Sequence, residues 1–185
     1  MQTLQWISVI MALVLGLGIT RLLTAAVGLF KARRRISMDW LPLAWAAALF
    51  VTQLQFWWAL GDLAVTTNKF PFLEFVALVT LPLMLFLTAA LLLPFGEEPA
   101  SLRAYFEADG KWALVALSLF FAGAFITNWK LFEAAPVAAW GLVNVLLIAL
   151  PLIVALSRSR TVQAVLTLIT VPLVAADTIL ASYWS

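Results

Sequence analysis

Six long apolar segments constrain this chain more than any other feature of its sequence. They cover residues 4–30, 40–61, 71–94, 112–133, 136–157 and 161–184. A helix needs about twenty apolar residues to cross a bilayer, and each segment reaches that length. The chain is 65% hydrophobic and 11% charged, whereas soluble domains are about 45–50% apolar and about 25% charged. The sequence therefore predicts an all-α integral membrane protein with six transmembrane helices, in a single domain over residues 1–185.

The loop after the third segment is predicted to carry a short helix over residues 101–109 that lies on the membrane surface. Ser101 suits an N-cap, and Gly110 suits the position just after a helix C-terminus. We expect a connector anchored at the interface, and a regulatory or partner-binding segment is the alternative. Its apolar edge would consist of Leu102, Tyr105 and Phe106.

Basic residues gather on one side of this predicted topology. That side holds Lys31, Arg33, Arg34, Arg35, Arg103, Lys111, Arg158 and Arg160. The other side holds Lys69 and Lys130. Because Lys and Arg are enriched in cytoplasmic loops, both termini are predicted to lie outside the cytoplasm. Tryptophan prefers the membrane boundaries. The sequence places Trp40 and Trp112 near the inner boundary, and Trp6, Trp57, Trp58, Trp129 and Trp184 near the outer one.

The lack of two residue types narrows the chemistry. The chain has no Cys and no His, which removes disulfides, thiolate ligands, the commonest general base and the usual axial ligand of membrane haems. It also lacks a P-loop, a dinucleotide fingerprint, zinc-ligand spacing and a potassium-filter sequence. We expect no cofactor, no metal site and no enzyme; a lipid-processing enzyme built on Arg21 and a carboxylate is a remote alternative. Topology accounts for the net charge of +2, so no nucleic-acid partner is expected.

A short sequence with a central proline occurs twice. Residues 78–83 (Leu-Val-Thr-Leu-Pro-Leu) are echoed by residues 168–173 (Leu-Ile-Thr-Val-Pro-Leu). An odd number of predicted crossings separates the two prolines, so the echo suggests a 3+3 inverted repeat, a plan shared by many transporters. The alternative is coincidence between helices rich in Leu and Thr.

Pro82 and Pro172 are also predicted to break their helices. A proline inside a helix frees the carbonyl four residues earlier, here that of Leu78 or Leu168. Lipid cannot satisfy such a carbonyl, and nearby threonines are candidate partners. The functional interpretation is a pair of hinges beside a central site, and the alternative is a structural kink. The threonines concerned are Thr80, Thr88 and Thr170.

Polar side chains concentrate in the outer half of the predicted membrane region. Charged and amide groups are costly in a bilayer, so each is a candidate for function. An acidic, amide-rich outer half suits a cation vestibule. The alternative is a set of hydrogen bonds between helices, worth about 0.6–2 kcal/mol each. The alternative is favoured for the amides, and function is favoured for Asp177. The residues concerned are Gln53, Gln55, Glu74, Asn128, Asn144 and Asp177, with Asp62 at the outer edge.

Two helices carry polar stripes with the same spacing. One stripe consists of Thr52, Gln55 and Asp62, and the other of Thr167, Thr170 and Asp177. Residues at these spacings share one helix face. Should the two faces meet, Asp62 and Asp177 would line one path to the outside.

Arg21 lies in the inner half of the first helix. It either snorkels to the cytoplasmic head groups or packs inward as a buried counter-ion or anion contact. Small residues beside it favour close helix packing, within the bundle or in a homodimer. They form two series, Gly18, Arg21, Ala25, Gly28 and Gly16, Thr20, Thr24, Gly28.

Four basic residues directly follow the first helix, namely Lys31, Arg33, Arg34 and Arg35. Their expected role is to set the topology. The alternative is attraction of anionic lipid, worth about 1 kcal/mol per residue near the surface.

Three stretches of the first hundred residues carry a family resemblance. They are Gly16-Leu-Gly-Ile-Thr-Arg-Leu-Leu23, Lys31-Ala-Arg-Arg-Arg35 and Gln53-Leu-Gln-Phe-Trp-Trp-Ala59. Together they resemble a group of uncharacterised small bacterial multi-pass membrane proteins. The resemblance implies a bacterial inner membrane and supplies no activity and no site residues.

These observations favour a small channel or transporter for a cation or small solute. At 20.3 kDa one subunit leaves little room for a pore, so a homo-oligomer, such as a homodimer, is expected. The alternative is a non-transporting accessory, anchor or sensor-partner protein. The predicted pathway residues are Asp177, Glu74, Gln55, Asp62, Asn144, Thr170 and Arg21, with Pro82 and Pro172 as helix breaks.

Overall fold

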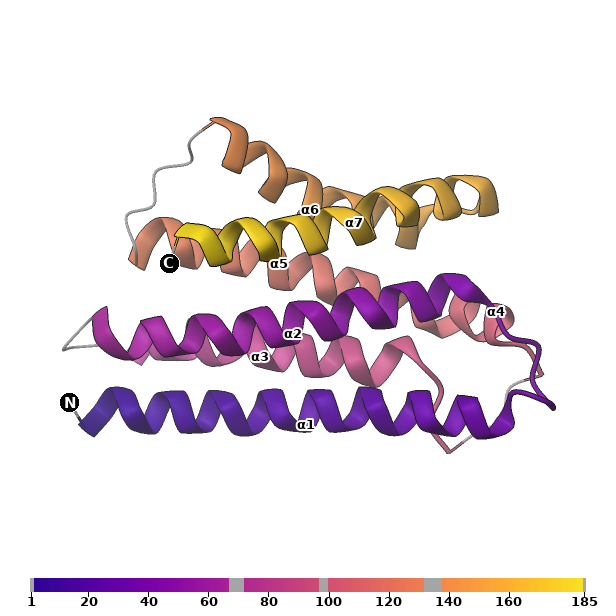
Figure 1. Ribbon diagram of the computed structural model, residues 1–185, viewed down its shortest axis with the longest axis horizontal. Coiled ribbons are helices and arrows are strands. Elements are labelled where there is room, and N and C mark those ends of the chain that lie inside the picture. The colour runs from indigo at the N-terminus through magenta and orange to yellow at the C-terminus, as the bar shows by residue number, and fades with distance from the viewer. Residues whose placement is uncertain (1, 67–71, 97–99, 132–137, 185) are drawn as a thin grey trace.

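Long helices that run roughly side by side form the molecule (Figure 1). The computed structural model describes residues 2–66, 72–96, 100–131 and 138–184, and the side chains of 8–61, 72–96, 100–130 and 141–178. The six long helices are α1 (Gln2–Ala32), α2 (Trp40–Thr66), α3 (Phe72–Leu92), α5 (Lys111–Leu131), α6 (Ala138–Leu156) and α7 (Arg160–Trp184). Among the described residues there is no strand, and Ser37 and Ser101 form an isolated bridge. The predicted all-helical fold is confirmed.

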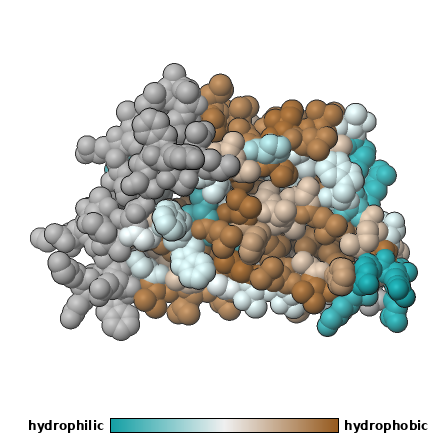
Figure 2. All heavy atoms as spheres, in the orientation of Figure 1, coloured by the Kyte–Doolittle hydropathy of each residue, from teal (hydrophilic) through white to brown (hydrophobic). Residues whose placement is uncertain are grey.

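Five of these helices are long and apolar enough to cross a membrane, namely α1, α2, α3, α5 and α7. The part of α6 with described side chains, Gly141–Leu156, is apolar but shorter. Large apolar side chains also cover the outside of the bundle, for example Leu13 at 65% exposure and Leu168 at 63%. Figure 2 shows this apolar surface along the body of the molecule. These features fit a membrane protein.

The segment before α5 differs from the predicted separate helix. Ser101 does cap α4 (Leu102–Tyr105), because its side chain accepts a hydrogen bond from the Ala104 N–H at 3.4 Å. The chain then passes through a π-helical turn, η1 (Phe106–Gly110), directly into α5. The prediction that Gly110 ends a helix is therefore wrong. A Cβ at Gly110 would lie 3.2 Å from the Leu92 carbonyl oxygen, so the glycine allows close packing on the end of α3.

The two ends of the bundle have different compositions. Both termini lie at one end, which we name the terminal end (Figure 1). The turns between α1 and α2 and between α6 and α7 lie at the other end, which we name the basic end. Figure 2 shows hydrophilic surface at the basic end. Its exposed basic residues include Lys31, Arg33, Arg34, Arg35 and Arg158.

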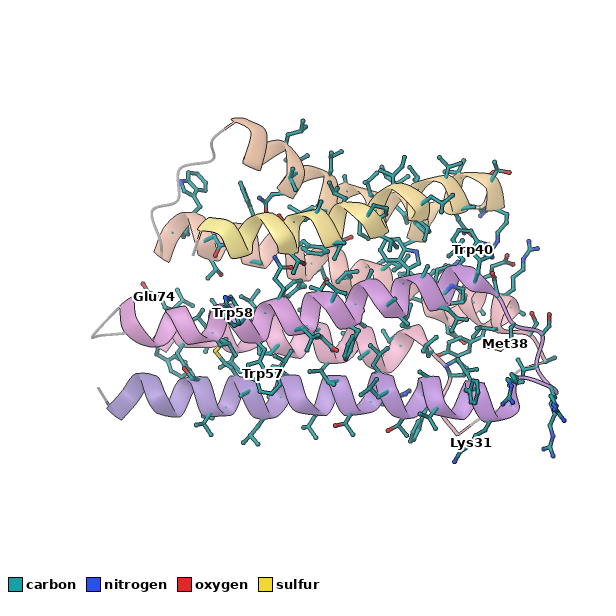
Figure 3. The ribbon with its side chains drawn as sticks, in the orientation of Figure 1. Lys31, Met38, Trp40, Trp57, Trp58 and Glu74 are labelled. Carbon is teal, nitrogen blue, oxygen red and sulfur yellow. The ribbon has the colours of Figure 1, made fainter. Side chains whose placement is uncertain are left out.

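Exposed tryptophans lie toward both ends of the apolar surface. Trp58 is 71% exposed on α2 toward the terminal end, and Trp40 is 47% exposed at the basic end (Figure 3). Trp57, Trp112 and Trp129 are likewise exposed, as expected for boundary residues. Trp6 and Trp184 lie outside the described side chains.

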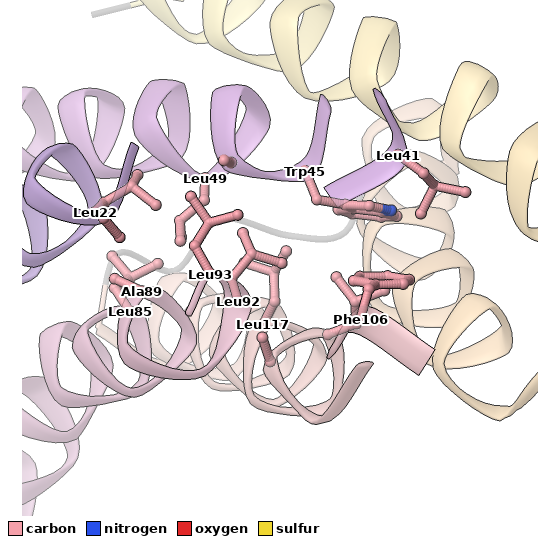
Figure 4. Packing of buried hydrophobic residues seen from close by; sticks show 14 of the residues in the cluster. Leu22, Leu41, Trp45, Leu49, Leu85, Ala89, Leu92, Leu93, Phe106 and Leu117 are labelled. Atoms are coloured by element: carbon pink, nitrogen blue, oxygen red, sulfur yellow. The ribbon is translucent and has the colours of Figure 1, made fainter. Parts of the chain in front are cut away.

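Helix α3 is central to the packing. It contacts both α1 and α5 extensively, while α7 packs on α2 and α6. Part of the apolar core is formed by Trp45 of α2, Phe106 of η1 and Leu117 of α5 (Figure 4). Because Leu102 and Phe106 are fully buried, α4 and η1 belong to this core.

The two echoed prolines occupy unlike surroundings. Pro82 is buried in α3, whereas Pro172 is exposed on α7. A third proline that the sequence analysis did not consider, Pro151, is buried inside α6. Among the described residues, the pairing of α1 with α3 has no counterpart of similar extent in the second half, where α7 packs on α6 and α2. The inverted repeat stays a prediction.

The threonines do not satisfy the carbonyls that the prolines free. Each donates its hydroxyl to the carbonyl of its own preceding turn, as is common for Thr in helices. The bonds run from Thr80 to Val76 at 2.8 Å, from Thr88 to Met84 at 2.8 Å and from Thr170 to Leu166 at 2.7 Å. The predicted pairing of these hydroxyls with Leu78 and Leu168 is therefore wrong.

Candidate functional site

The polar stripes of α2 and α7 face each other, as their spacing predicted. Trp45 donates its indole N–H to the Thr167 hydroxyl at 2.9 Å, and Gln55 donates to Asp177 at 3.1 Å. Both pairs are 122 positions apart in sequence, so the two helices run in parallel. We name this contact the α2–α7 seam. Its residues are Asp39, Trp45, Thr52 and Gln55 on one side, and Arg160, Gln163, Thr167, Thr170, Asp177 and Thr178 on the other.

Three half-buried side chains form the part of the seam nearest the terminal end. The Gln55 amide Nε2 donates to Asp177 Oδ2 at 3.1 Å, and its Oε1 accepts from the Thr178 hydroxyl at 3.0 Å. That hydroxyl also lies 2.9 Å from the Val174 carbonyl oxygen. Because it carries one hydrogen, it donates to one of these acceptors at a time. Gln55 thus holds the carboxylate in one orientation.

The register of the seam differs from what equal spacing suggests. Equal spacing would place Asp62 level with Asp177, but the structure places Gln55 there. Asp62 comes seven residues after Gln55, which is about 10 Å farther along α2 toward the terminal end. The Asp62 side chain lies outside the described residues.

The middle of the seam is closed. Trp45, Thr167 and Thr170 have no exposed surface. The Thr167 hydroxyl accepts from Trp45 and donates to the Gln163 carbonyl at 2.7 Å. Thr52, also buried, donates to the Ala48 carbonyl at 3.0 Å. Packed hydroxyls and an indole therefore occupy this level.

An ion pair between Arg160 and Asp39 closes the seam at the basic end. Asp39 also accepts a hydrogen bond from the Leu41 N–H at 3.2 Å and so caps the start of α2. Gln163 donates to the Ser157 carbonyl at 2.9 Å. Two buried atoms here, Arg160 Nη1 and Gln163 Oε1, have no hydrogen-bond partner among the described residues.

Sequence reasoning missed several seam residues. Arg160 was assigned only to topology, Asp39 and Gln163 were not predicted as site residues, and Thr178 was matched only with Thr88 in the proline echo. A signal was present, because 160, 163, 167, 170, 174 and 177 follow the alternating three- and four-residue steps of one helix face. All of these positions except Val174 are polar.

Other predicted pathway residues lie on other helices. Glu74 is half-buried in the first turn of α3, where a carboxylate suits the helix dipole, at the terminal end (Figure 3). Asn144 is half-buried on α6. Thr170 is in the seam, as described above. Of the predicted residues, the structure thus joins Gln55 and Asp177 directly.

Arg21 packs inward from α1 onto the end of α3. Its Nη2 lies 3.0 Å from the Ala90 carbonyl oxygen and 3.4 Å from that of Leu93. The guanidinium also lies 4.4 Å from the centre of the Phe95 ring. A cation at a helix C-terminus satisfies carbonyls that the helix leaves free. This arrangement favours the inward-packing alternative, with a structural role.

Gln53 is fully buried, and neither end of its amide has a hydrogen-bond partner among the described residues. For that part of the chain, the prediction that it forms a hydrogen bond between helices is wrong. The amide lies against α1, where a Cβ at Gly18 would come 2.8 Å from Gln53 Nε2.

Comparisons with protein-family models, with curated proteins and with solved structures give no match. The geometry of the seam therefore carries the functional argument. It offers one carboxylate held by a neutral amide, a closed hydroxyl-lined middle and an ion pair at the far end.

Proposed function

We propose that this chain is a small membrane channel or transporter for a cation or small solute, acting as a homo-oligomer, with the α2–α7 seam as its route. One observation carries the proposal. Asp177 lies in an apolar helix, and a neutral amide, Gln55, holds its carboxylate. Acidic groups inside membrane helices are costly and commonly mark ion pathways.

Asp177 is suited to receive a cation. Among the described residues, the salt bridges are Arg160–Asp39 and Arg103–Glu107, and Asp177 belongs to neither. The Gln55 amide occupies one carboxylate oxygen and fixes its direction. A half-buried carboxylate that forms no salt bridge with a described basic residue attracts positive charge more strongly than one in water.

The proposal includes a topology. All six long helices cross the membrane, the basic end faces the cytoplasm and both termini face outward, in a bacterial inner membrane. Arg33 donates to the Phe30 carbonyl at 2.7 Å, while Lys31, Arg34 and Arg35 extend into solvent, where anionic lipid would meet them. A 3+3 inverted repeat would relate α1–α3 to α5–α7 in this topology.

A second copy would bind at the outward face of α1. Gly16, Thr20, Thr24 and Gly28 are all exposed there. A Cβ added at Gly16 or Gly28 meets nothing within 4 Å. Small residues at such a face let two helices approach closely.

A specific observation also favours the accessory alternative. The middle of the seam is filled by side chains that bond to each other and to their own helices. Hydrogen bonds of this kind hold bundles together without any transport.

Ion flux into liposomes containing the purified protein tests the proposal. We expect wild-type flux of a cation, and a decrease of at least about tenfold for Asp177→Asn, because the substitution removes the charge and keeps the shape. Asp109→Asn, the same change at an exposed position on η1, is the matched control and should have no effect. Absence of flux of every tested ion from a folded oligomer would favour the accessory alternative.

A further inference from the structure

The α2–α7 seam is almost as long as a membrane is thick. Asp177 comes seventeen positions after Arg160 on α7, which is about 25 Å of helix. The hydrocarbon core of a bilayer is about 30 Å thick. The ion pair at one end and the Gln55–Asp177 pair at the other are therefore positioned to lie near opposite faces of the core.

Polar groups follow each other closely along this length. The steps from Arg160 to Gln163, Thr167 and Thr170 are three or four residues, or about 4–6 Å each. Thr52 continues the series from α2, three residues before Gln55. Two hydrogen bonds through one water cover about 5.5 Å. One water in each gap would complete a chain of hydrogen bonds from end to end.

Two buried atoms at the basic end are candidates for hydrogen bonds to internal water. Arg160 Nη1 is a donor and Gln163 Oε1 is an acceptor, and both lack a partner among the described residues. They lie one helical turn apart on the same face of α7. Buried polar atoms of this kind are commonly satisfied by internal water, which needs two to four polar neighbours.

The close packing in the middle of the α2–α7 seam limits which cations can pass. A metal ion or an organic solute would have to displace Trp45, Thr167 and Thr170, which are fully buried. A proton needs less space, because it moves by exchange along hydrogen bonds and requires only single waters between the side chains.

We infer that the transported cation is the proton and that the α2–α7 seam is its path. A hydronium ion at the terminal end gives its proton to the Asp177 carboxylate and becomes water. The carboxyl group then passes that proton to a water in the seam and is a carboxylate again. Each water or hydroxyl beyond it accepts one proton and releases one, until a water at the basic end receives it. No other bond changes. The inference rests on the proposed transport function.

Proton, potassium and sodium fluxes in liposomes test it together. Thr167→Val and Thr170→Val remove a hydroxyl and keep the side-chain shape. Thr88→Val is the matched control, because Thr88 is also fully buried and also bonded to its preceding turn, but lies on α3. Thr167→Ser and Thr170→Ser restore the hydroxyls, and the unfolding transition of each variant checks its fold.

We expect proton flux in the wild type, a decrease of at least about tenfold in both Val variants, recovery in the Ser variants and no change in Thr88→Val. An undiminished proton flux in the Val variants would show that the seam is not the path. Flux of potassium or sodium without protons would overturn the inference and leave the transport proposal standing. No flux of any of the three ions from a folded oligomer would overturn the inference and favour the accessory alternative over cation transport.

Discussion

The contact between α7 and α2 is made by polar side chains, whereas the contact between α1 and α3 is made by close apolar packing. Along the seam, α7 contributes polar side chains, and Val174 is its fully buried member of the apolar core. Helix α3 contributes Leu81, Leu85, Ala89 and Leu92 to that core, and α1 approaches it closely at Gly18. Between membrane helices the hydrophobic effect adds little, so polar bonds and close packing are the two available means of association. This bundle uses each in a different place.

The largest expected loss of stability comes from removing the charge of Asp39 at the basic end. Asp39→Asn keeps an acceptor for the Leu41 N–H but leaves Arg160 without its partner charge. Because Asp39 is 9% exposed, we expect the free energy of unfolding to fall by about 2–3 kcal/mol. Chemical denaturation in detergent micelles measures this.

The control is Glu107→Gln, which breaks the exposed Arg103–Glu107 pair. We expect little change in the unfolding free energy there, because solvent screens an exposed pair. Equal losses in the two variants would mean that the seam is not anchored by its ion pair.

Gly18→Ala tests the close approach of α1. The new Cβ would lie 2.8 Å from Gln53 Nε2 and 3.4 Å from the Phe86 Cα, so we expect a loss of about 1–3 kcal/mol in unfolding free energy. Gly16→Ala, in open space on the same helix, should leave that value unchanged or raise it by up to about 1 kcal/mol. If both variants lose stability alike, close packing at Gly18 is not what joins α1 to the bundle.

The two smallest expected changes in stability have opposite signs, a gain where Gln53 lies against α1 and a loss in the α2–α7 seam. Gln53→Leu removes a buried amide without a described partner, so we expect the protein to gain about 1 kcal/mol of stability. Thr178→Val keeps the side-chain shape, removes the bond to Gln55 and should cost about 0.6–1 kcal/mol. The unfolding midpoints of the two variants, compared in one micelle, measure the contrast. A loss in Gln53→Leu would show that this amide has a partner in the folded protein.

Periodicity explains which features the sequence could predict. Long apolar segments indicated the helices, and a three- to four-residue polar spacing indicated that α2 and α7 share a contact. The same spacing fits several registers, so it could not tell that Gln55 rather than Asp62 meets Asp177. That choice depends on how side chains pack along the whole contact.

Local sequence patterns gave wrong or incomplete predictions for residues that can serve two structural roles. Gly110 is a residue type that often follows a helix end, yet here it continues the helix. A glycine is favoured at this position because the end of α3 lies where a side chain would be. Asp39 and Arg160 lie at the ends of predicted segments, where charge is expected anyway. Their ion pair joins positions 121 residues apart, and the sequence next to either residue does not predict it.

The parallel pairing of α2 with α7 also has a consequence for biosynthesis. Every described hydrogen bond between these helices joins residues at least 121 positions apart. At about 5–20 residues per second, a ribosome needs about 6–24 s to make that length of chain. During this time Asp39, Trp45 and Gln55 have been synthesised and their partners have not. Helix α7 therefore completes the polar contacts of α2, and the polar side chains of α2 must wait for these partners until α7 has been made.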